Sequence, residues 1–391
     1  MSDNLDKFEG DFSSLWSLDV MPALHRLSWW WYWVIILIPD PLNPQRSRQL
    51  MTLWSTKETD SIRVSGHWWK PGSRMYKDEN DGFVIPGMVC AWWYDGEKMF
   101  EPLVLRKCRM LALDHRHELW PSNSAGGAIV PFTDDDLSMG LRPDNSAFWL
   151  RLMSDQIMVD QGAPSSFNLE MTPWNPPLSA ATRSHNLFTG SMGYDILRLH
   201  GTKATGTIDG EDVEGTAYFQ KVVVQAPSVP WFWGFLHFDD GSYFDWFMPH
   251  LSLSVTANDS TPWKRRDRHR FPLRTAGLFH DARRGRTERF ERCEVELIHS
   301  TTDSLLDSDG NILPSFKVRV WNGRTQISTI LRATSRAHWT FNQPTRMGLE
   351  SHFTYNEYPL TVEKLVIMDE VEGITGVVDI TDHAAGTDPF Y

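Results

Sequence analysis

The feature that constrains this chain most is a pair of neighbouring ring-rich segments, WFWGFLHF at residues 231–238 and YFDWF at residues 243–247. If each segment is a strand, successive side chains point to opposite faces. In the first segment one face would carry Trp231, Trp233 and His237, and the other face would be apolar as well. A strand with two apolar faces is either buried between layers or part of a closed barrel with an apolar lumen. The pattern therefore predicts a strand that is covered on both sides.

The two segments flank DDGS at residues 239–242, whose Asp-Gly pair is typical of a hairpin turn. A hairpin would place His237 and Asp245 on neighbouring strands, among rings. A few polar groups among apolar side chains are what a binding pocket uses to orient a ligand. The alternative is that the rings form an inter-domain core and that a backbone group satisfies the His237 imidazole. If the site is a catalytic pocket, Asp245 and His237 are its candidate proton donors.

Tryptophan is abundant in the rest of the chain too. Of the 391 residues 19 are Trp, and packing alone rarely selects Trp because a buried indole N–H needs an acceptor. This abundance favours an aromatic-lined site for a hydrophobic small molecule. Besides Asp245 and His237, the candidate ligand contacts are Tyr218, Gln220, Trp231, Trp233, Trp246, Trp31, Trp93 and Glu357.

Charge, cysteines and hydropathy argue against several classes of partner. The formal net charge of −12 opposes binding to nucleic acid or to an anionic membrane, because both need a basic surface. The three cysteines are far apart and lack a CxxC spacing, which favours a reducing cytoplasm and neither disulfides nor structural zinc. The acidic first residues do not resemble an export signal. The run WWWYWVIILI at residues 29–38 is shorter than the roughly 20 residues of a membrane-spanning helix, so it predicts a strand and no integral membrane segment.

Short apolar or alternating runs bounded by Gly, Pro, Asn and Asp recur along the chain, whereas sustained helical spacing is scarce. We therefore predict a mainly β fold with few helices. Among the expected strands are short runs at residues 156–159, 196–202 and 203–208.

A stretch rich in Pro, Ser and Gly, PWNPPLSAATRSHNLFTGSMG at residues 173–193, predicts a linker. The chain is long enough for two domains. We expect an N-terminal β domain at residues 1–187 and a C-terminal β domain at residues 188–391. The oligomeric state is left open.

Other motifs carry less chemistry. In DHRHE at residues 114–118, His115 and His117 have a spacing that could ligate a metal on a strand, but an exposed polar turn is favoured and we expect no metal site. TDDD at residues 133–136 is more typical of a helix start or solvated turn than of a calcium loop. Nucleophile-elbow, dinucleotide and P-loop patterns are absent from the sequence.

Four short motifs together carry a resemblance to a known family. They are WWY at residues 30–32, DGEDVEGTAYF at residues 209–219, PWFWGFLHFDDGSYFDWF at residues 230–247 and EVEGITGVVDITDH at residues 370–383. This pattern resembles the two-domain lipocalin-like family of carotenoid 1,2-hydratases, which also takes in attachment-related proteins and, more remotely, the fungal decalin-forming Diels–Alderases. The resemblance implies two lipocalin-like β-barrel or β-sandwich domains in tandem. It also implies a hydrophobic pocket near their junction that acts on isoprenoids or polyenes without a cofactor.

The chain departs from the hydratase pattern at one point that matters for chemistry. Where that pattern continues with Asp-His-x-Trp-Gly, this chain has Gln220-Lys221-Val222-Val223, so the usual acid and imidazole are absent. Proton transfer would then fall to Asp245, His237 or Glu357. Three hypotheses stay open: a cofactor-independent enzyme that cyclises, isomerises or hydrates a polyene or isoprenoid, a carrier of such a molecule, or a structural protein with an aromatic interface.

Overall fold

The structure is a computed structural model that describes most of the strands and their tight turns. The described residues are 5–7, 28–40, 42, 46–57, 62–64, 67–69, 76–77, 83–114, 126–130, 137–141, 147–173, 181–187, 193–225, 230–252, 270–273, 275–298, 305–344, 350–369 and 374–376. Nearly all of them are in strands or in the turns that join strands, and the one helix among them, α2 (Gln156–Asp160), is short. The mainly β class with few helices is confirmed. Within these residues no helix is long and apolar enough to span a membrane.

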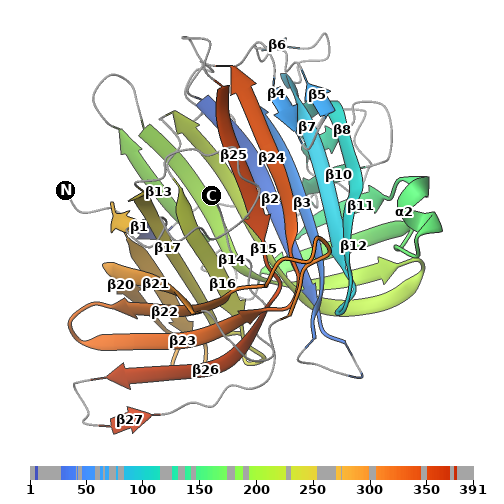
Figure 1. The fold of residues 1–391 in the computed structure, drawn as a ribbon. Helices are drawn as coiled ribbons and strands as arrows, with labels where there is room; N and C mark the ends of the chain where they lie inside the picture. Colours follow the sequence, from blue (N-terminus) through green and yellow to red (C-terminus); the bar gives the residue numbers. More distant parts are fainter. Residues whose placement is uncertain are drawn as a thin grey trace.

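The largest sheet has 13 strands and is curled (Figure 1). Its strands are β1 (Leu5–Lys7), β2 (Ser28–Ile38), β3 (Arg48–Lys57), β6 (Tyr76–Lys77), β7 (Phe83–Tyr94), β8 (Met99–Asp114), β9 (Gly126–Val130), β10 (Leu137–Leu141), β11 (Phe148–Met153), β12 (Ser166–Pro173), β13 (Ala181–Leu187), β14 (Gly193–Ile208) and β15 (Glu211–Gln225). The pairing runs from β2 through β3, β7, β8, β9, β10, β11 and β12 to β14, and β15 then pairs with both β14 and β2. The hydrogen-bonded ladder therefore closes on itself.

Three smaller sheets complete the described fold (Figure 1). The hairpin sheet contains β16 (Trp231–His237), β17 (Tyr243–Ser252), β19 (Ala276–Asp281) and β20 (Arg286–Phe290), with β18 (Arg270–Pro272) paired to β17. The C-terminal sheet contains β21 (Arg292–Ile298), β22 (Ser315–Trp321), β23 (Thr325–Ala333), β26 (Leu360–Asp369) and β27 (Ile374–Gly376). The last sheet joins β25 (Glu350–Glu357) and β24 (Ala337–Pro344) to β4 (Ile62–Val64) and β5 (His67–Trp69).

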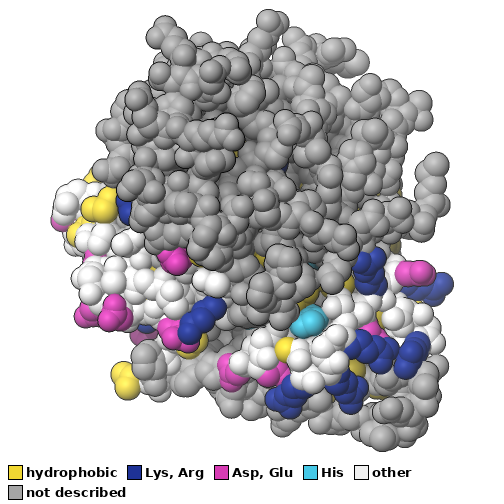
Figure 2. Space-filling model, turned by 180° about the vertical axis from the view of Figure 1, so that it is seen from behind, with side chains coloured by type: hydrophobic (Ala, Val, Ile, Leu, Met, Phe, Trp, Pro, Cys, Tyr) yellow, Lys and Arg dark blue, Asp and Glu magenta, His cyan; other side chains and the backbone are white. Residues whose placement is uncertain are grey.

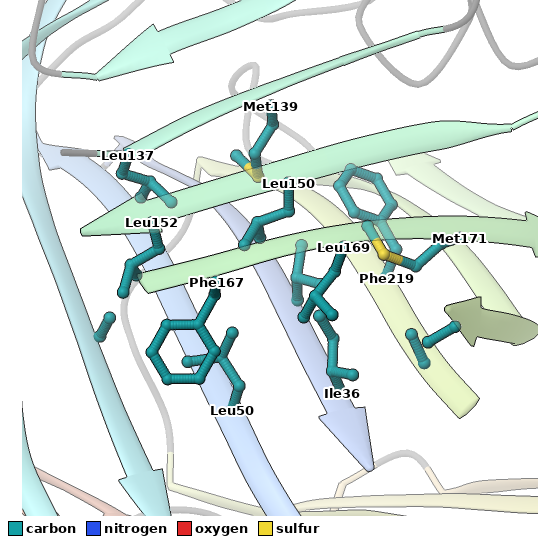
Figure 3. Packing of buried hydrophobic residues seen from close by; sticks show 14 of the residues in the cluster. Ile36, Leu50, Leu137, Met139, Leu150, Leu152, Phe167, Leu169, Met171 and Phe219 are labelled. Atoms are coloured by element: carbon teal, nitrogen blue, oxygen red, sulfur yellow. The ribbon is translucent and has the colours of Figure 1, made fainter. Parts of the chain in front are cut away.

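Strand β2 explains how the curled sheet is stabilised, because both of its faces are apolar. Tyr32, Val34 and Ile36 point to the inside of the sheet, and Trp33 and Ile35 point to the outside. The inside is filled by side chains that we call the first core, part of which Figure 3 draws. Its labelled members are Ile36, Leu50, Leu137, Met139, Leu150, Leu152, Phe167, Leu169, Met171 and Phe219. Burial of this apolar surface is the main stabilising contribution to the sheet.

The ring-rich hairpin β16–β17 lies between two layers, which confirms one of the two alternatives that its pattern allowed. One face of β16 packs on the outside of the curled sheet, and the other face, with Phe232 and Leu236, belongs to a second core shared with the C-terminal sheet. Close packing in that core requires Gly234, because a Cβ there would lie 2.2 Å from the ring of Trp246 on the paired strand. Each face of the hairpin thus has its own apolar partner.

Two local predictions are wrong. Residues 156–159 form a turn of helix α2 instead of a strand, and residues 173–193 are not one linker, because β13 within them pairs with β14 and β1. The large sheet also continues past residue 187, since β14 and β15 belong to it. The division into domains at residues 187 and 188 stays a prediction.

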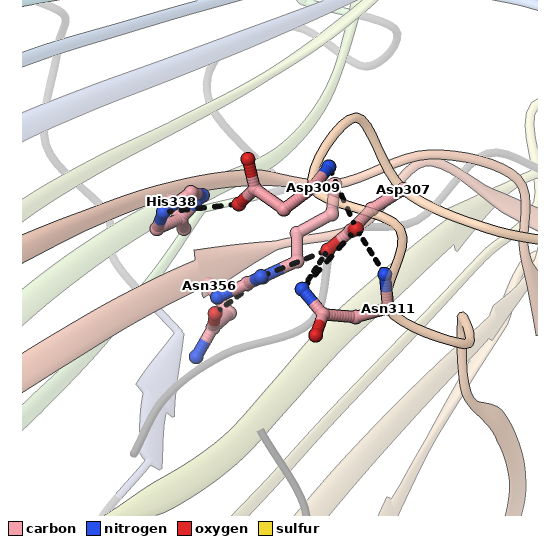
Figure 4. Close-up of polar contacts among 6 residues, drawn as sticks. Asp307, Asp309, Asn311, His338 and Asn356 are labelled. Atoms are coloured by element: carbon pink, nitrogen blue, oxygen red, sulfur yellow. Dashed lines mark hydrogen bonds and ion pairs between the residues drawn. The ribbon is translucent and has the colours of Figure 1, made fainter. Parts of the chain in front are cut away.

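A polar cluster ties the loop before β22 to the sheet of β24 and β25 (Figure 4). Arg336 donates from Nη1 to Asp307 over 2.9 Å and from Nε to Asn356 over 2.8 Å, and the Asn311 backbone N–H donates to Asp307 over 2.7 Å. Arg336 and Asp307 are both buried. Hydrogen bonds that satisfy a buried charged pair on several sides hold a loop in one conformation.

Candidate functional site

The outer face of the curled sheet meets the hairpin sheet along a third group of buried side chains, which we call the interface cluster. Its buried members are Trp33, Ile35, Leu37, Met51, Leu53, Met88, Cys90, Trp92, Tyr218, Trp233, Phe235 and Ala337. Trp31, Met99, Leu105, Trp231, Phe247 and Tyr355 pack around it and are partly exposed. Tyr218 on β15 is in contact with two rings of β16, at 5.0 Å from Trp233 and 4.7 Å from Phe235.

A bulge in β14 brings an imidazole to this cluster. The register between β14 and β15 shifts between Leu199 and Thr202. Leu199 and Ala204 are five positions apart, so in a regular strand their side chains would point to opposite faces. Both side chains nevertheless lie in the first core. Bulges are common next to active sites because they re-aim side chains. Here the bulge contains His200 and Gly201, and the His200 side chain contacts the hairpin.

His200 is paired with Asp245 of β17. The distance from His200 Nδ1 to Asp245 Oδ2 is 3.2 Å, and the two side chains are 2% and 7% exposed. The imidazole is stacked on Tyr243 at 5.2 Å and lies edge-on to Tyr218 at 6.0 Å. An acid and an imidazole are therefore enclosed by rings, which is the setting in which groups that transfer protons are found.

His237 lies nearby but has a different contact set. Its Nε2 is 2.6 Å from the His200 carbonyl oxygen and its Nδ1 is 2.8 Å from Thr216 Oγ1. Because a carbonyl only accepts, Nε2 carries the proton and Nδ1 accepts from the Thr216 hydroxyl. Burial lowers the pKa of His237 to about 3, against the opposite effect of the bond to the His200 carbonyl. His237 is thus neutral at pH 7 and holds the backbone of the bulge.

Tyr218 and Gln220 continue the polar part of the cluster on β15. The Tyr218 hydroxyl donates to Gln220 Oε1 over 2.8 Å. Burial, with the negative charge of Asp245, raises the pKa of Tyr218 well above its ordinary value, while Arg198 acts in the opposite direction. The Tyr218 hydroxyl is therefore a neutral hydrogen-bond donor at any physiological pH.

The remaining predicted contacts fall into three places. Trp31 and Trp231 lie at the edge of the cluster, stacked at 6.4 Å with 8° between their planes. Glu357 is buried beside Tyr355, and burial together with the charge of Glu357 raises the pKa of Tyr355. Trp246 lies in the second core and Trp93 in the first core. The structure therefore does not bring Trp93 and Trp246 to the other candidates.

Two residues of this region, His200 and Arg198, are missing from the candidates that the sequence suggested. Their signal is the alternation of ILRLH at residues 196–200, in which the side chains at 198 and 200 are polar and share a face. The sequence predicted a hairpin with Asp245 on the strand next to that of His237, and the pairing of β16 with β17 confirms the hairpin. The imidazole that contacts Asp245, however, is that of His200.

In the described part of the chain, no three His, Cys, Asp or Glu side chains are placed together in a way that could hold a metal ion. His115, His117 and residues 133–136 lie outside the described residues.

No protein-family model matches the chain, and no curated protein matches it. Among solved structures it is similar to an AttH of Nitrosomonas europaea, with 13% identity and a TM-score of 0.47 over 93% of this chain and 92% of that one. It is also similar to kievitone hydratase from Nectria haematococca, with 11% identity and a TM-score of 0.42 over 96% and 94% of the two chains. A third similar structure is CghA with Sch210972, with 9% identity and a TM-score of 0.44 over 93% and 87%.

Proposed function

We propose that the chain is an enzyme that binds a hydrophobic small molecule at the interface cluster and transfers a proton with Asp245, held by His200. The observation that carries the proposal is the pair itself, with its facing atoms 3.2 Å apart among aromatic rings. Burying an acid and an imidazole has a large desolvation cost and often adds little stability, so a structural purpose explains the pair poorly. Groups that move protons at a reacting centre need such a setting.

For the substrate we propose an isoprenoid or polyene, and for the reaction its cyclisation, isomerisation or hydration. The rings of Trp233 and Phe235 would hold the molecule in a reactive conformer, and their π faces would stabilise developing positive charge. Asp245 would exchange the proton with the substrate, and Tyr218, whose hydroxyl proton is donated to Gln220, would contribute its ring to the wall of the site. Side chains of the chain itself perform every step of this scheme.

A purely structural role is the second candidate function. The rings of Tyr218 and Phe235 are stacked at 4.7 Å, as they would be in an ordinary core between two sheets. In this reading, and also for a carrier of the same molecules, Asp245 performs no chemistry. The chemistry of Asp245 therefore separates the enzyme from both alternatives.

The test is turnover of isoprenoid and polyene probes, such as retinol, retinoic acid and farnesol, followed by mass spectrometry. Asp245→Asn is nearly isosteric and removes the carboxyl group that would exchange the proton, so we expect turnover to fall about 100-fold or more while affinity stays within about threefold. Asp240→Asn, at the turn of the same hairpin and paired with Arg283 on the surface, is the matched control and should keep full turnover. Undiminished turnover in Asp245→Asn would show that the acid assignment is wrong. Saturable binding without any conversion by the wild type would favour the carrier.

A further inference from the structure

Arg198 is a buried cation without a matching acid in the described structure. It is 8% exposed, no carboxylate of the described residues forms an ion pair with it, and its Nε finds no acceptor among them. Asp245, one of the buried acids of the site, is paired with His200. A buried charge is costly unless it is paired, so a guanidinium in this position requires an explanation.

The groups that face Arg198 leave its charge uncompensated. Its guanidinium carbon lies 5.7 Å from the centre of the Phe247 ring, and it bonds to the Tyr218 side chain. Across the ladder it is opposite Gln220, whose Oε1 already accepts from Tyr218. All three neighbours are neutral.

Two more donors in the same cluster have no acceptor among the described residues. These are the indole N–H groups of Trp33 and Trp233, both buried. Trp33 is the cross-strand neighbour of Gln220, which makes Arg198, Gln220 and Trp33 one row across three strands. Trp233 is in contact with Tyr218. Arg198 Nε and the two indole N–H groups are thus donors without an acceptor among the described residues, and one of the three carries a positive charge.

The partly exposed rings lie next to this charge. Trp231 is 6.4 Å from both Trp31 and Phe247, and Phe247 is the ring beneath the guanidinium. An apolar body lying on these rings would therefore have one end within reach of Arg198.

We infer that the molecule bound here carries a carboxylate at one end of its apolar body, and that Arg198 binds this carboxylate. The inference rests on the proposed function in that it takes the interface cluster as the binding site, and it adds the chemical class and the orientation of the ligand. A single guanidinium matches a single negative charge, and its planar fork fits the two oxygens of a carboxylate. The carboxylate compensates the buried charge, and the rings of Trp31, Trp231 and Phe247 contact the apolar part.

The experiment compares two probes that differ only in the terminal group, retinoic acid and retinol, by saturable quenching of Trp fluorescence. The wild type should bind the acid at least about tenfold more tightly than the alcohol, as expected for charge-assisted hydrogen bonds. Arg198→Met keeps the apolar stem and removes the charge, so both probes should bind it within about threefold of each other, with retinol affinity unchanged. Arg198→Lys should recover part of the preference. Retinyl phosphate serves as a third probe, and a preference for it over the acid would overturn the carboxylate assignment.

The matched control is Arg319→Met, which removes an exposed guanidinium from over the Trp321 ring in the C-terminal sheet and should leave the preference intact. If the wild type binds the acid and the alcohol equally, the inference is overturned while the proposed function stays in place. This comparison can be made without any variant. Saturable binding of neither probe contradicts the proposed function and the inference together. Loss of turnover in Asp245→Asn with no preference for the acid would support the enzyme and reject the role of Arg198.

Discussion

His237 has both ring nitrogens engaged and is enclosed by rings, with Phe235 at 4.9 Å. Because the bulge interrupts the regular ladder, the His200 carbonyl oxygen needs another donor, and the His237 Nε2–H supplies it. An uncharged imidazole is the form that fits this position, because protonation of Nδ1 would remove the acceptor of the Thr216 hydroxyl proton and add a buried charge. The role of His237 is thus to hold His200 in place beside Asp245.

This geometry predicts a pH dependence of folding stability. Burial lowers the pKa of His237 from 6.5 to about 3, so between these values the unfolded chain binds a proton that the folded chain does not. The free energy of unfolding therefore falls as the pH is lowered through this window and recovers as the pH is raised, by roughly 3 kcal/mol between pH 7 and pH 4.

Urea unfolding at pH 7 and pH 4 measures this contribution. In His237→Gln, which does not titrate, the difference in unfolding free energy between the two pH values should be smaller than in the wild type by most of that amount. His280→Gln is the matched control, because His280 is only half-buried and burial lowers its pKa less strongly. An unchanged pH dependence in His237→Gln would contradict the assignment of His237 as a buried neutral imidazole.

Among the structural elements, the loop at residues 305–312 is held by Asp307 rather than by apolar packing. Leu305, Leu306 and Ile312 of this loop are exposed, whereas Asp307 is buried against Arg336 at 2.9 Å (Figure 4). Although burial acts to raise it, hydrogen bonds from Arg336 and Asn311 lower the pKa of Asp307 below its ordinary value. The loop therefore depends on one ionised carboxylate.

We expect Asp307→Asn to lower the free energy of unfolding by about 3 kcal/mol at pH 7, because it leaves Arg336 as an uncompensated buried charge. The contribution of Asp307 to the free energy of unfolding is present at pH values above the ordinary pKa of an aspartate. This contribution is lost as the pH falls through the lowered pKa that Asp307 has in the folded protein. Chemical denaturation at pH 7 and pH 3 checks both statements. Asp309→Asn is the matched control, since Asp309 is exposed and 3.7 Å from His338, and it should cost less than about 1 kcal/mol. Equal losses in the two variants would contradict the argument.

At the scale of the molecule, the hairpin sheet contributes side chains to both the first core and the second core. Tyr243 and Leu278 of this sheet reach the first core, while Phe244 and Trp246 lie in the second core. On the face drawn in Figure 2, the described residues display Lys and Arg next to Asp and Glu. Ion pairs such as Arg319 with Glu294 are exposed. Exposed pairs of this kind add little stability, so the shared apolar cores hold the sheets together.

We therefore expect the chain to unfold in a single cooperative transition. Denaturant curves followed by far-ultraviolet circular dichroism and by Trp fluorescence should coincide, because neither core can open without exposing the hairpin sheet. Trp233→Ala should shift both curves together by several kcal/mol, as is usual for a buried Trp replaced by Ala. Two separate transitions would show that the parts on either side of the hairpin unfold independently.

Several features of this protein follow from the sequence by itself. The β class, the turn at Asp240-Gly241 and the double-sided burial of residues 231–238 follow because side-chain alternation and turn chemistry are local properties. The same local reasoning placed Asp245 on β17, the strand that pairs with the strand of His237. The short run at 156–159 was beyond this reasoning, since a few apolar residues fit a helix as well as a strand.

Only the tertiary structure decided which rings and polar groups meet. The runs at 196–202 and 203–208 look like two strands, but they form one bulged strand, β14, and its packing on the hairpin brings His200 to Asp245. Trp93 and Trp246 look like Trp233 in the sequence, yet they belong to separate cores. Segment 181–187 has no apolar face of its own and becomes β13 through its pairing with β14. The physical reason is common to these cases: a strand forms half of its hydrogen bonds and contacts with residues far away in the chain, so its local pattern does not specify its partners.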